Sequence, residues 1–366
     1  MSSSNVIVLS AGGTGGHLFP AQALAGALVR RGCEIVVMTD SRFANYATAF
    51  PAARIETVPS SPFNAITAPF KIAAGIVMAW TKLLKLKPAA VVGFGGYPSV
   101  PVMMAANLAG LPTAIIEQNA VVGRANRLVM NQVKVVAAAF PIARFGPSDK
   151  SKIVLTGNPL RPEVEALWGA PYRMPQSGGP LHLLVFGGSQ GARAMSEIVP
   201  AALSRLPHDL KARLSVVQQC RPEDIETVRQ IYANADIRAE LQTFFNNLPR
   251  RMADSHLVIA RSGAGTVAEL MAIGRPAILV PLPAALDDNQ TPNADILARA
   301  DAGWRVKQSD LTPDSLAQML TKIFSDSPGL ARRAASAHSL AVPQAAEKLA
   351  DVVQNLAHSS AAKRAA

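Results

Sequence analysis

The stretch GGTGGH near the N-terminus joins a glycine-rich loop to a histidine, and both could do chemistry. It follows a short apolar run and precedes a stretch of helical character. Glycine lets a ligand approach the backbone closely, and the free N–H groups at the start of a helix favour an anion. The stretch therefore predicts a cradle for a phosphate or a sugar-phosphate. The alternative is a tight turn that only packs.

His17 is the first side chain of this stretch that could act as a base. The positive end of a helix disfavours a charged imidazole, so we expect a neutral ring. A neutral ring can take the proton of an attacking hydroxyl. The alternative is a histidine that only packs or caps the helix.

A second glycine-containing turn, RSGAGTVAEL, lies in the second half of the chain and begins another predicted helix. Its amides from Ser262 to Thr266 form a second candidate anion site. Glu269 could bind two ribose hydroxyls while the turn holds a diphosphate, or it could only satisfy the helix dipole. The amides Asn289, Gln290 and Asn293 stand where sugar hydroxyls could be bound.

The sequence contains no D-x-D motif and no His, Cys and Asp spacing typical of a metal site. We therefore expect neither a metal nor another cofactor. Helix N-termini together with Arg161 or Arg261 would have to neutralise a bound diphosphate.

The charge balance favours anionic partners. The chain of 366 residues has a formal net charge of +11, which suits phosphates, nucleic acid or an anionic membrane surface. Aromatic residues make up only 5% of the chain and no RNP-type or zinc-finger motif is present, so we expect no nucleic-acid partner. The two cysteines are far apart in sequence and indicate a reducing compartment.

Residues 70–88, FKIAAGIVMAWTKLLKLKP, predict a basic amphipathic helix. At 100° per residue, Lys71, Lys82 and Lys85 share one face. The opposite face carries the apolar side chains Ile72, Ile76, Trp80, Leu83 and Leu84. Such a helix binds a membrane surface or packs on a sheet. No apolar run is long enough to span a membrane, and the N-terminus lacks the features of a signal peptide.

Short β-branched runs alternate with helical stretches along the chain, which predicts an α/β fold with two parallel sheets. We expect a domain at 1–160, a Pro- and Gly-rich linker at 161–180, a second domain at 181–340, and a C-terminal helix with a disordered tail at 341–366 that returns to the first domain. The predicted strands are Val6–Leu9, Ile35–Met38, Ala90–Gly93, Thr113–Ile116, Val133–Ala137, Ile153–Thr156, Leu183–Phe186, Leu214–Gln218, Leu257–Ala260 and Ala277–Val280.

Seven motifs occur in order over nearly the whole chain: GGTGGHLFPA, GFGGYPS, EQNAVVGRANR, TGNPLR, GGSQGAR, RSGAGTVAEL and GRPAILVP. Together they closely resemble the MurG family of bacterial N-acetylglucosaminyltransferases. The resemblance implies a GT-B fold, in which two Rossmann-like domains face a cleft. It also implies transfer of GlcNAc from UDP-GlcNAc to the lipid-linked acceptor lipid I, which gives lipid II for peptidoglycan.

By motif position, the resemblance implies donor-binding roles on both domains. The phosphates, ribose, uracil and GlcNAc of the donor would be contacted by Thr14, Gly15, Gly16, Asn119, Arg161, Ser189, Phe245, Arg261, Ala264, Gly265, Thr266, Val267, Ala268, Glu269, Asn289 and Gln290. Phe245 would lie by the uracil, Glu269 would bind the ribose and Gln290 the GlcNAc hydroxyls.

The resemblance further implies an inverting, metal-independent reaction. His17 would deprotonate the 4-hydroxyl of the muramoyl sugar, with Glu117 as the second candidate base. Acceptor or membrane contacts would come from Gly95, Gly96, Tyr97, Asn126, Ile72, Ile76, Trp80, Lys82, Leu83 and Lys85. The chain would act on the cytoplasmic face of the bacterial membrane, with proteins of cell-wall synthesis and division as partners.

Three other functions remain open from the residues. A glycolipid synthase acting on diacylglycerol would share the GT-B fold and differ in its substrates. A nicotinamide-dependent dehydrogenase would use GGTGGH and Asp40, although the spacing is not G-x-G-x-x-G. A membrane-surface scaffold would have no catalytic use for His17.

Overall fold

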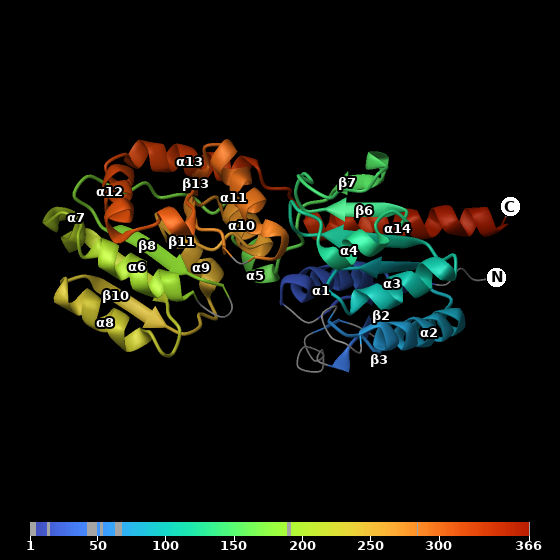
Figure 1. Cartoon of the computed structure of the whole chain (residues 1–366). Coiled ribbons are helices and arrows are strands. Elements are labelled where there is room, and N and C mark those ends of the chain that lie inside the picture. The colour runs from blue at the N-terminus through green and yellow to red at the C-terminus, as the bar shows by residue number, and fades with distance from the viewer. Residues whose placement is uncertain are drawn as a thin grey trace. The chain divides into compact units, whose positions relative to one another are not determined.

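The apolar runs of the sequence form two parallel sheets in the computed structural model, which describes residues 5–12, 15–41, 50–51, 54–62, 68–188, 192–283 and 285–365. The chain divides into two units. Unit 1 comprises Met1–Arg161 and Val342–Ala366, and unit 2 comprises Pro162–Ala341. Figure 1 shows both units and labels many of their elements. None of the helices within the described ranges is long and apolar enough to cross a membrane.

Unit 1 contains a sheet with the order β3-β2-β1-β4-β5-β6-β7, and its paired strands are parallel. The central strands are apolar on both faces, as expected for a sheet covered by helices on both sides. The strands are β1 (Val6–Ser10), β2 (Glu34–Thr39), β3 (Arg54–Thr57), β4 (Ala90–Gly93), β5 (Thr113–Glu117), β6 (Val135–Ala138) and β7 (Ile153–Leu155).

Helices cover the two faces of this sheet. On one face α1 (Gly15–Arg30) and α14 (Ala345–Ala365) pack their apolar side chains, among them Leu24 and Val353, against the strands. On the other face α2 (Ala68–Leu86) and α3 (Ser99–Leu108) do the same, with α4 (Arg124–Val129) following β5. The C-terminal helix is therefore part of the core of unit 1.

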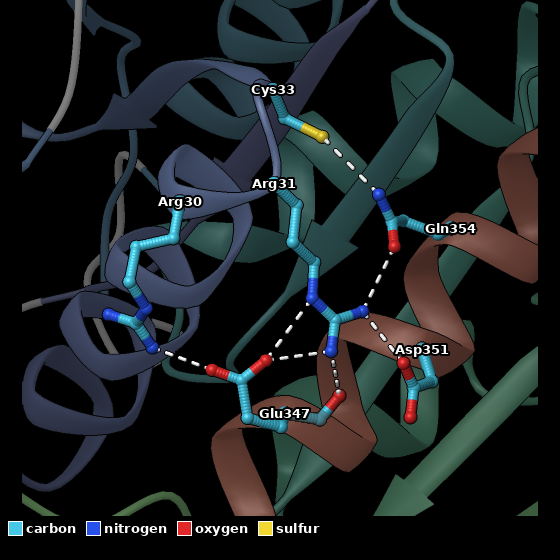
Figure 2. A network of polar contacts seen from close by, with 6 residues as sticks. All are labelled: Arg30, Arg31, Cys33, Glu347, Asp351 and Gln354. Carbon is cyan, nitrogen blue, oxygen red and sulfur yellow. Dashed lines mark hydrogen bonds and ion pairs between the residues drawn. The ribbon is translucent and has the colours of Figure 1, made fainter.

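Polar contacts also hold α14 against unit 1, and Figure 2 shows them. Arg30 and Arg31, which lie where α1 ends, both contact Glu347 in the first turn of α14. Arg31 also donates to Asp351 and to the Gln354 side chain, one and two turns further along the same helix. One guanidinium thus spans the first turns of α14.

Unit 2 contains a sheet with the order β10-β9-β8-β11-β12-β13, and its paired strands are also parallel. The strands are β8 (Leu181–Phe186), β9 (Leu214–Gln219), β10 (Arg238–Gln242), β11 (Leu257–Ala260), β12 (Ala277–Leu279) and β13 (Gly303–Arg305). The helices are α5 (Pro162–Glu165), α6 (Arg193–Leu203), α7 (His208–Arg213), α8 (Ile225–Asn234), α9 (Leu248–Ala253), α10 (Ala264–Ile273), α11 (Gln290–Arg299), α12 (Pro313–Phe324) and α13 (Ser327–Ser339).

The prediction of two Rossmann-like parallel sheets is confirmed, and every predicted strand overlaps an observed one. The prediction omitted β3, β10 and β13, which lie at sheet edges. Their sequences, RIET, RAELQ and GWR, lack the apolar runs that mark the central strands. An edge strand pairs on one side only and is partly exposed, so its composition carries a weaker signal.

Candidate functional site

The glycine-rich motifs lie at the carboxyl ends of the parallel strands, where open α/β sheets bind ligands. In unit 1, GGTGGH follows β1 and GFGGYPS follows β4. The two loops approach each other so closely that a Cβ on Gly12 would lie 2.4 Å from Pro98 Cγ. Glycine at position 12 is therefore required by the packing of the loops.

His17 lies in the first turn of α1, next to the loop after β4. A Cβ on Gly95 would lie 3.4 Å from His17 Nε2 and 3.4 Å from Asn126 Nδ2. Gly95 has a φ of +82°, which a residue with a side chain rarely adopts. The structure thus brings together three of the predicted site residues of unit 1.

The environment of His17 keeps its imidazole neutral. Desolvation lowers the pKa of His17 to about 4, and a hydrogen bond to the backbone of Gly12 acts in the opposite direction. Because a neutral ring has one N–H, donation to the Gly12 carbonyl leaves the other ring nitrogen as the proton acceptor. This is the protonation state that a general base needs.

Glu117, the second candidate base, is buried at the end of β5 and is surrounded by donors. One oxygen accepts from the Asn119 backbone and side chain, at 3.0 and 3.3 Å. The other accepts from the Gly123 backbone and Asn126 Nδ2, both at 2.9 Å. Desolvation raises the pKa of Glu117, while these hydrogen bonds oppose the rise. This geometry makes Glu117 an anchor for its loop and favours His17 as the base.

Other predicted residues of unit 1 lie beside α1, at its start and in the loop after β4. The Arg161 guanidinium lies over the ring of Phe19 in α1, 5.2 Å from its centroid. Gly15 and Gly16 begin α1, and Tyr97 follows Gly96 in the loop after β4. Thr14 in unit 1 and Ser189 in unit 2 lie outside the described residues.

In unit 2, the turn RSGAG joins β11 to α10, and α10 begins at Ala264 after Gly263. The residues Gly265, Thr266, Val267, Ala268 and Glu269 follow within this helix, and the Glu269 side chain is partly exposed. The turn is fastened to α11, because Ser262 Oγ donates to the Gln290 carbonyl at 2.8 Å and Asn293 Nδ2 donates to the Ser262 carbonyl at 3.1 Å. The two predicted donor segments are thus adjacent.

Arg261 is not free to bind a diphosphate as predicted. Its guanidinium is buried and donates to the backbone carbonyls of Val280 and Pro281 and to the side chain of Gln308. Burial also lowers the pKa of Arg261. In this geometry Arg261 Nη1 and Nη2 bond to the protein, so the predicted diphosphate contact would require these bonds to be exchanged.

Phe245, which is predicted to lie by the uracil, has a buried side chain. Its side chain is 5% exposed, and the Arg251 guanidinium lies 5.6 Å from its ring centroid. Phe244 beside it is 60% exposed. The two residues are of one type and adjacent in sequence, so composition could not tell which of them is buried.

The helix α2 buries only part of its predicted apolar face, together with two small residues. Gly75, Ala79 and Leu83 are buried, so the expectation that Leu83 faces a membrane is wrong. Lys82 forms an ion pair with Glu56. Ile72 and Ile76 are partly buried, whereas Trp80 is 42% exposed. The exposed apolar side chains on α2 are Phe70, Val77, Met78, Trp80 and Leu84, and Lys71 and Lys85 are exposed beside them.

The titratable side chains of the described residues include no group of three or more His, Cys, Asp or Glu that could hold a metal ion.

Comparison with known proteins gives concordant matches. The glycosyltransferase family 28 N-terminal domain matches residues 7–138, and the family 28 C-terminal domain matches residues 182–355. A relative from Rhodopseudomonas palustris is 48% identical over 364 residues, which cover 98% of this chain and 100% of the relative. A relative from Phenylobacterium zucineum is 47% identical over 357 residues, which cover 96% and 98%.

Both relatives are named UDP-N-acetylglucosamine–N-acetylmuramyl-(pentapeptide) pyrophosphoryl-undecaprenol N-acetylglucosamine transferase. Among solved structures, Acinetobacter baumannii MurG matches with a TM-score of 0.81 and 34% identity. That match covers 96% of this chain and 99% of the solved one.

Proposed function

Because the chain belongs to glycosyltransferase family 28, we propose that it transfers N-acetylglucosamine from UDP-GlcNAc to the 4-hydroxyl of the muramoyl sugar in lipid I. The product is lipid II, a precursor of peptidoglycan. The observation that carries this proposal is 48% identity, over 98% of the chain, with a transferase named for this reaction. The glycine-rich turns at the carboxyl ends of both sheets supply the sites that such a reaction needs.

Unit 2 binds the donor in this proposal. The N–H groups at the start of α10 stabilise the diphosphate, so no metal is needed. Glu269 accepts hydrogen bonds from the ribose, and Gln290, with Asn289 before it, contacts the GlcNAc hydroxyls. Phe244, which is exposed, replaces Phe245 as the aromatic side chain for the uracil.

Unit 1 binds the acceptor and supplies the base. The neutral ring of His17 takes the proton of the 4-hydroxyl while the 4-oxygen forms a bond to C1 of GlcNAc. The bond from C1 to the diphosphate oxygen breaks, and UDP leaves with the electron pair. Attack opposite to the leaving group inverts the configuration at C1. Gly95 and Asn126, beside His17, contact the acceptor.

The exposed side chains of α2 support a location at the membrane surface. Phe70 is 81% exposed and lies next to Lys71. Apolar side chains beside lysines bind anionic lipid surfaces. The proposal therefore places α2 against the cytoplasmic face of the bacterial membrane, where the acceptor lies and where proteins of cell-wall synthesis and division are partners.

The test measures transfer of labelled GlcNAc from UDP-GlcNAc to a short-chain lipid I analogue in the presence of EDTA, with diacylglycerol as a parallel acceptor. We expect label in the lipid I product despite EDTA. Transfer to diacylglycerol alone, or transfer only from another UDP-sugar, would move the chain to the glycolipid synthases. Loss of transfer on adding EDTA would contradict the metal-free mechanism.

A further inference from the structure

Arg261 and Gln290 belong to one continuous set of contacts in unit 2. Arg261 Nη1 donates to the carbonyls of Val280 and Pro281, at 3.1 and 3.2 Å, where the chain leaves β12. The next residue, Leu282, donates its backbone N–H to Gln290 Oε1 at 3.0 Å. The Arg261 guanidinium therefore holds the segment that in turn holds the Gln290 side chain.

Gln308 completes this set from the other side. Its Oε1 accepts from Arg261 Nη2 at 2.6 Å. Gln308 lies in the short turn η4 (Gln308–Asp310), which follows β13. Because a buried guanidinium is costly unless its N–H groups are bonded, the Gln308 oxygen fixes which way Arg261 points.

The orientation of the Gln290 amide follows from these bonds. Leu282 donates to its oxygen, so the oxygen lies toward residues 280–282 and the NH₂ group lies on the other edge of the amide. The Gln290 backbone is fixed as well, because its carbonyl accepts from Ser262 Oγ at 2.8 Å. Gln290 thus presents hydrogen-bond donors, whose partners are oxygen acceptors such as sugar hydroxyls.

We propose that Arg261 and Gln308 are positioning residues for Gln290, holding residues 280–282 so that the Gln290 NH₂ group donates to the sugar of the nucleotide-sugar. The inference rests on the proposed function, since it assigns the sugar contact to Gln290. Arg261 touches no substrate in this arrangement. It acts on the sugar through the backbone of residues 280–282, and Gln308 acts through Arg261.

The experiment compares the affinities of UDP-GlcNAc and UDP for the full chain by calorimetry, without acceptor. We expect Gln308→Leu and Arg261→Met to weaken UDP-GlcNAc about fivefold to tenfold, the effect of one lost hydrogen bond. Affinity for UDP should be unchanged, because UDP lacks the GlcNAc that Gln290 contacts. Gln308→Glu keeps an acceptor for Arg261 and should retain affinity for UDP-GlcNAc.

Three results would overturn the inference. An equal loss of affinity for UDP and for UDP-GlcNAc would mean that Arg261 contributes to diphosphate binding or to the stability of the whole fold. Unchanged UDP-GlcNAc affinity in Gln308→Leu would mean that the contact between Gln308 and Arg261 does not position Gln290. A Gln290→Ala, Gln308→Leu double variant that is weaker than Gln290→Ala by the full single-variant factor would mean that the two residues act independently.

Matched controls separate this inference from the fold and from the proposed function. Gln318→Leu makes the same change on the exposed face of α12 and should leave both affinities unchanged. Thermal unfolding shows whether Arg261→Met remains folded, and the partly exposed Gln308 carries the test if it does not. Wild-type protein that binds UDP-GlcNAc but does not glycosylate lipid I would contradict the proposed function and leave the positioning inference testable.

Discussion

Arg31, which follows α1, and Glu347, in the first turn of α14, are 316 positions apart in sequence, and the Arg31 Nη2 lies 2.7 Å from Glu347 Oε2 (Figure 2). The same guanidinium donates through Nε to that oxygen at 3.1 Å and through Nη1 to Asp351 at 2.7 Å. One arginine therefore joins the N-terminal and C-terminal parts of unit 1. A guanidinium with several fixed partners contributes more than an isolated surface pair.

We expect Arg31→Ala to lower the free energy of unfolding by about 1 to 2 kcal/mol, because several hydrogen bonds to α14 are lost together. Urea unfolding measures the change. Arg229→Ala, which removes an exposed ion pair with Glu226 on α8, serves as the control and should change stability by less than about 0.5 kcal/mol. Equal effects of the two variants would show that the contacts of Arg31 with α14 add no stability beyond a surface pair.

His17→Ala should reduce turnover about 100-fold to 10,000-fold while leaving the fold and UDP-GlcNAc affinity unchanged, because the proton of the acceptor hydroxyl then lacks its base. The pH profile offers a second measurement. The pKa of His17 in the free protein is about 4, so its ring is neutral above that pH. The acid limb of kcat/KM for the acceptor should accordingly lie near pH 4. An acid limb near the ordinary histidine pKa, or full turnover in His17→Ala, contradicts the assignment.

Phe244 and Phe245 should respond in opposite ways to truncation. Phe245→Ala removes a buried ring and should cost about 3 kcal/mol or more of unfolding free energy. Phe244→Ala removes an exposed ring, so stability should change by less than about 0.5 kcal/mol while UDP affinity falls about tenfold. Each variant is the control for the other in calorimetry with UDP and in thermal unfolding. A stable Phe245→Ala with weakened UDP binding would restore Phe245 as the contact with uracil.

Much of the fold could be predicted from sequence because buried parallel strands consist of apolar, β-branched runs and the turns after them are rich in glycine. The buried face of α2 could not be predicted from the sequence. Helical periodicity groups the large apolar residues, but Gly75 and Ala79 pack inward together with Leu83. A Cβ on Gly75 would come within 2.1 Å of the Pro59 carbonyl oxygen. Small residues allow this close approach, so several large apolar side chains of α2 remain outside.

The candidate site, like the fold, could be predicted from the sequence only in part. Sequence placed His17, Gly95 and the turn before α10 correctly at strand ends, because motif and strand order fix those positions. It could not tell whether Arg261 points toward a ligand or toward the carbonyls of Val280 and Pro281. That choice depends on Gln308, which is distant in sequence and belongs to no motif.

Glu269→Ala should weaken UDP-GlcNAc about tenfold to 100-fold, since a charged hydrogen-bond acceptor for the ribose is lost. The partly exposed position of Glu269 on α10 predicts little change in thermal stability. A 2′,3′-dideoxy form of UDP-GlcNAc tests the role directly, because wild type and variant should bind it equally. Undiminished UDP-GlcNAc affinity in Glu269→Ala would remove the ribose assignment.

Acid should destabilise the fold through His256, which lies before β11 next to His182. His256 Nδ1 accepts a hydrogen bond from the His182 backbone at 2.9 Å, so protonation of that nitrogen breaks the bond. Desolvation, His182 and Arg275 together lower the pKa of His256 to about 4, compared with 6.5 for an unperturbed histidine. The unfolded chain therefore binds the proton more tightly.

The contribution of neutral His256 to stability is complete above about pH 6.5 and is lost as the pH falls through about 4. We expect urea midpoints to fall between about pH 7 and about pH 4.5, and to fall less steeply in His256→Asn, whose amide oxygen can still accept the His182 N–H. His17 in unit 1, whose pKa is also about 4, accounts for part of the pH dependence of stability that remains in His256→Asn. The exposed His208→Asn is the control and should keep the wild-type slope. If the pH dependence of the urea midpoint is unchanged in His256→Asn, the pKa of His256 is the same in the folded and unfolded chain.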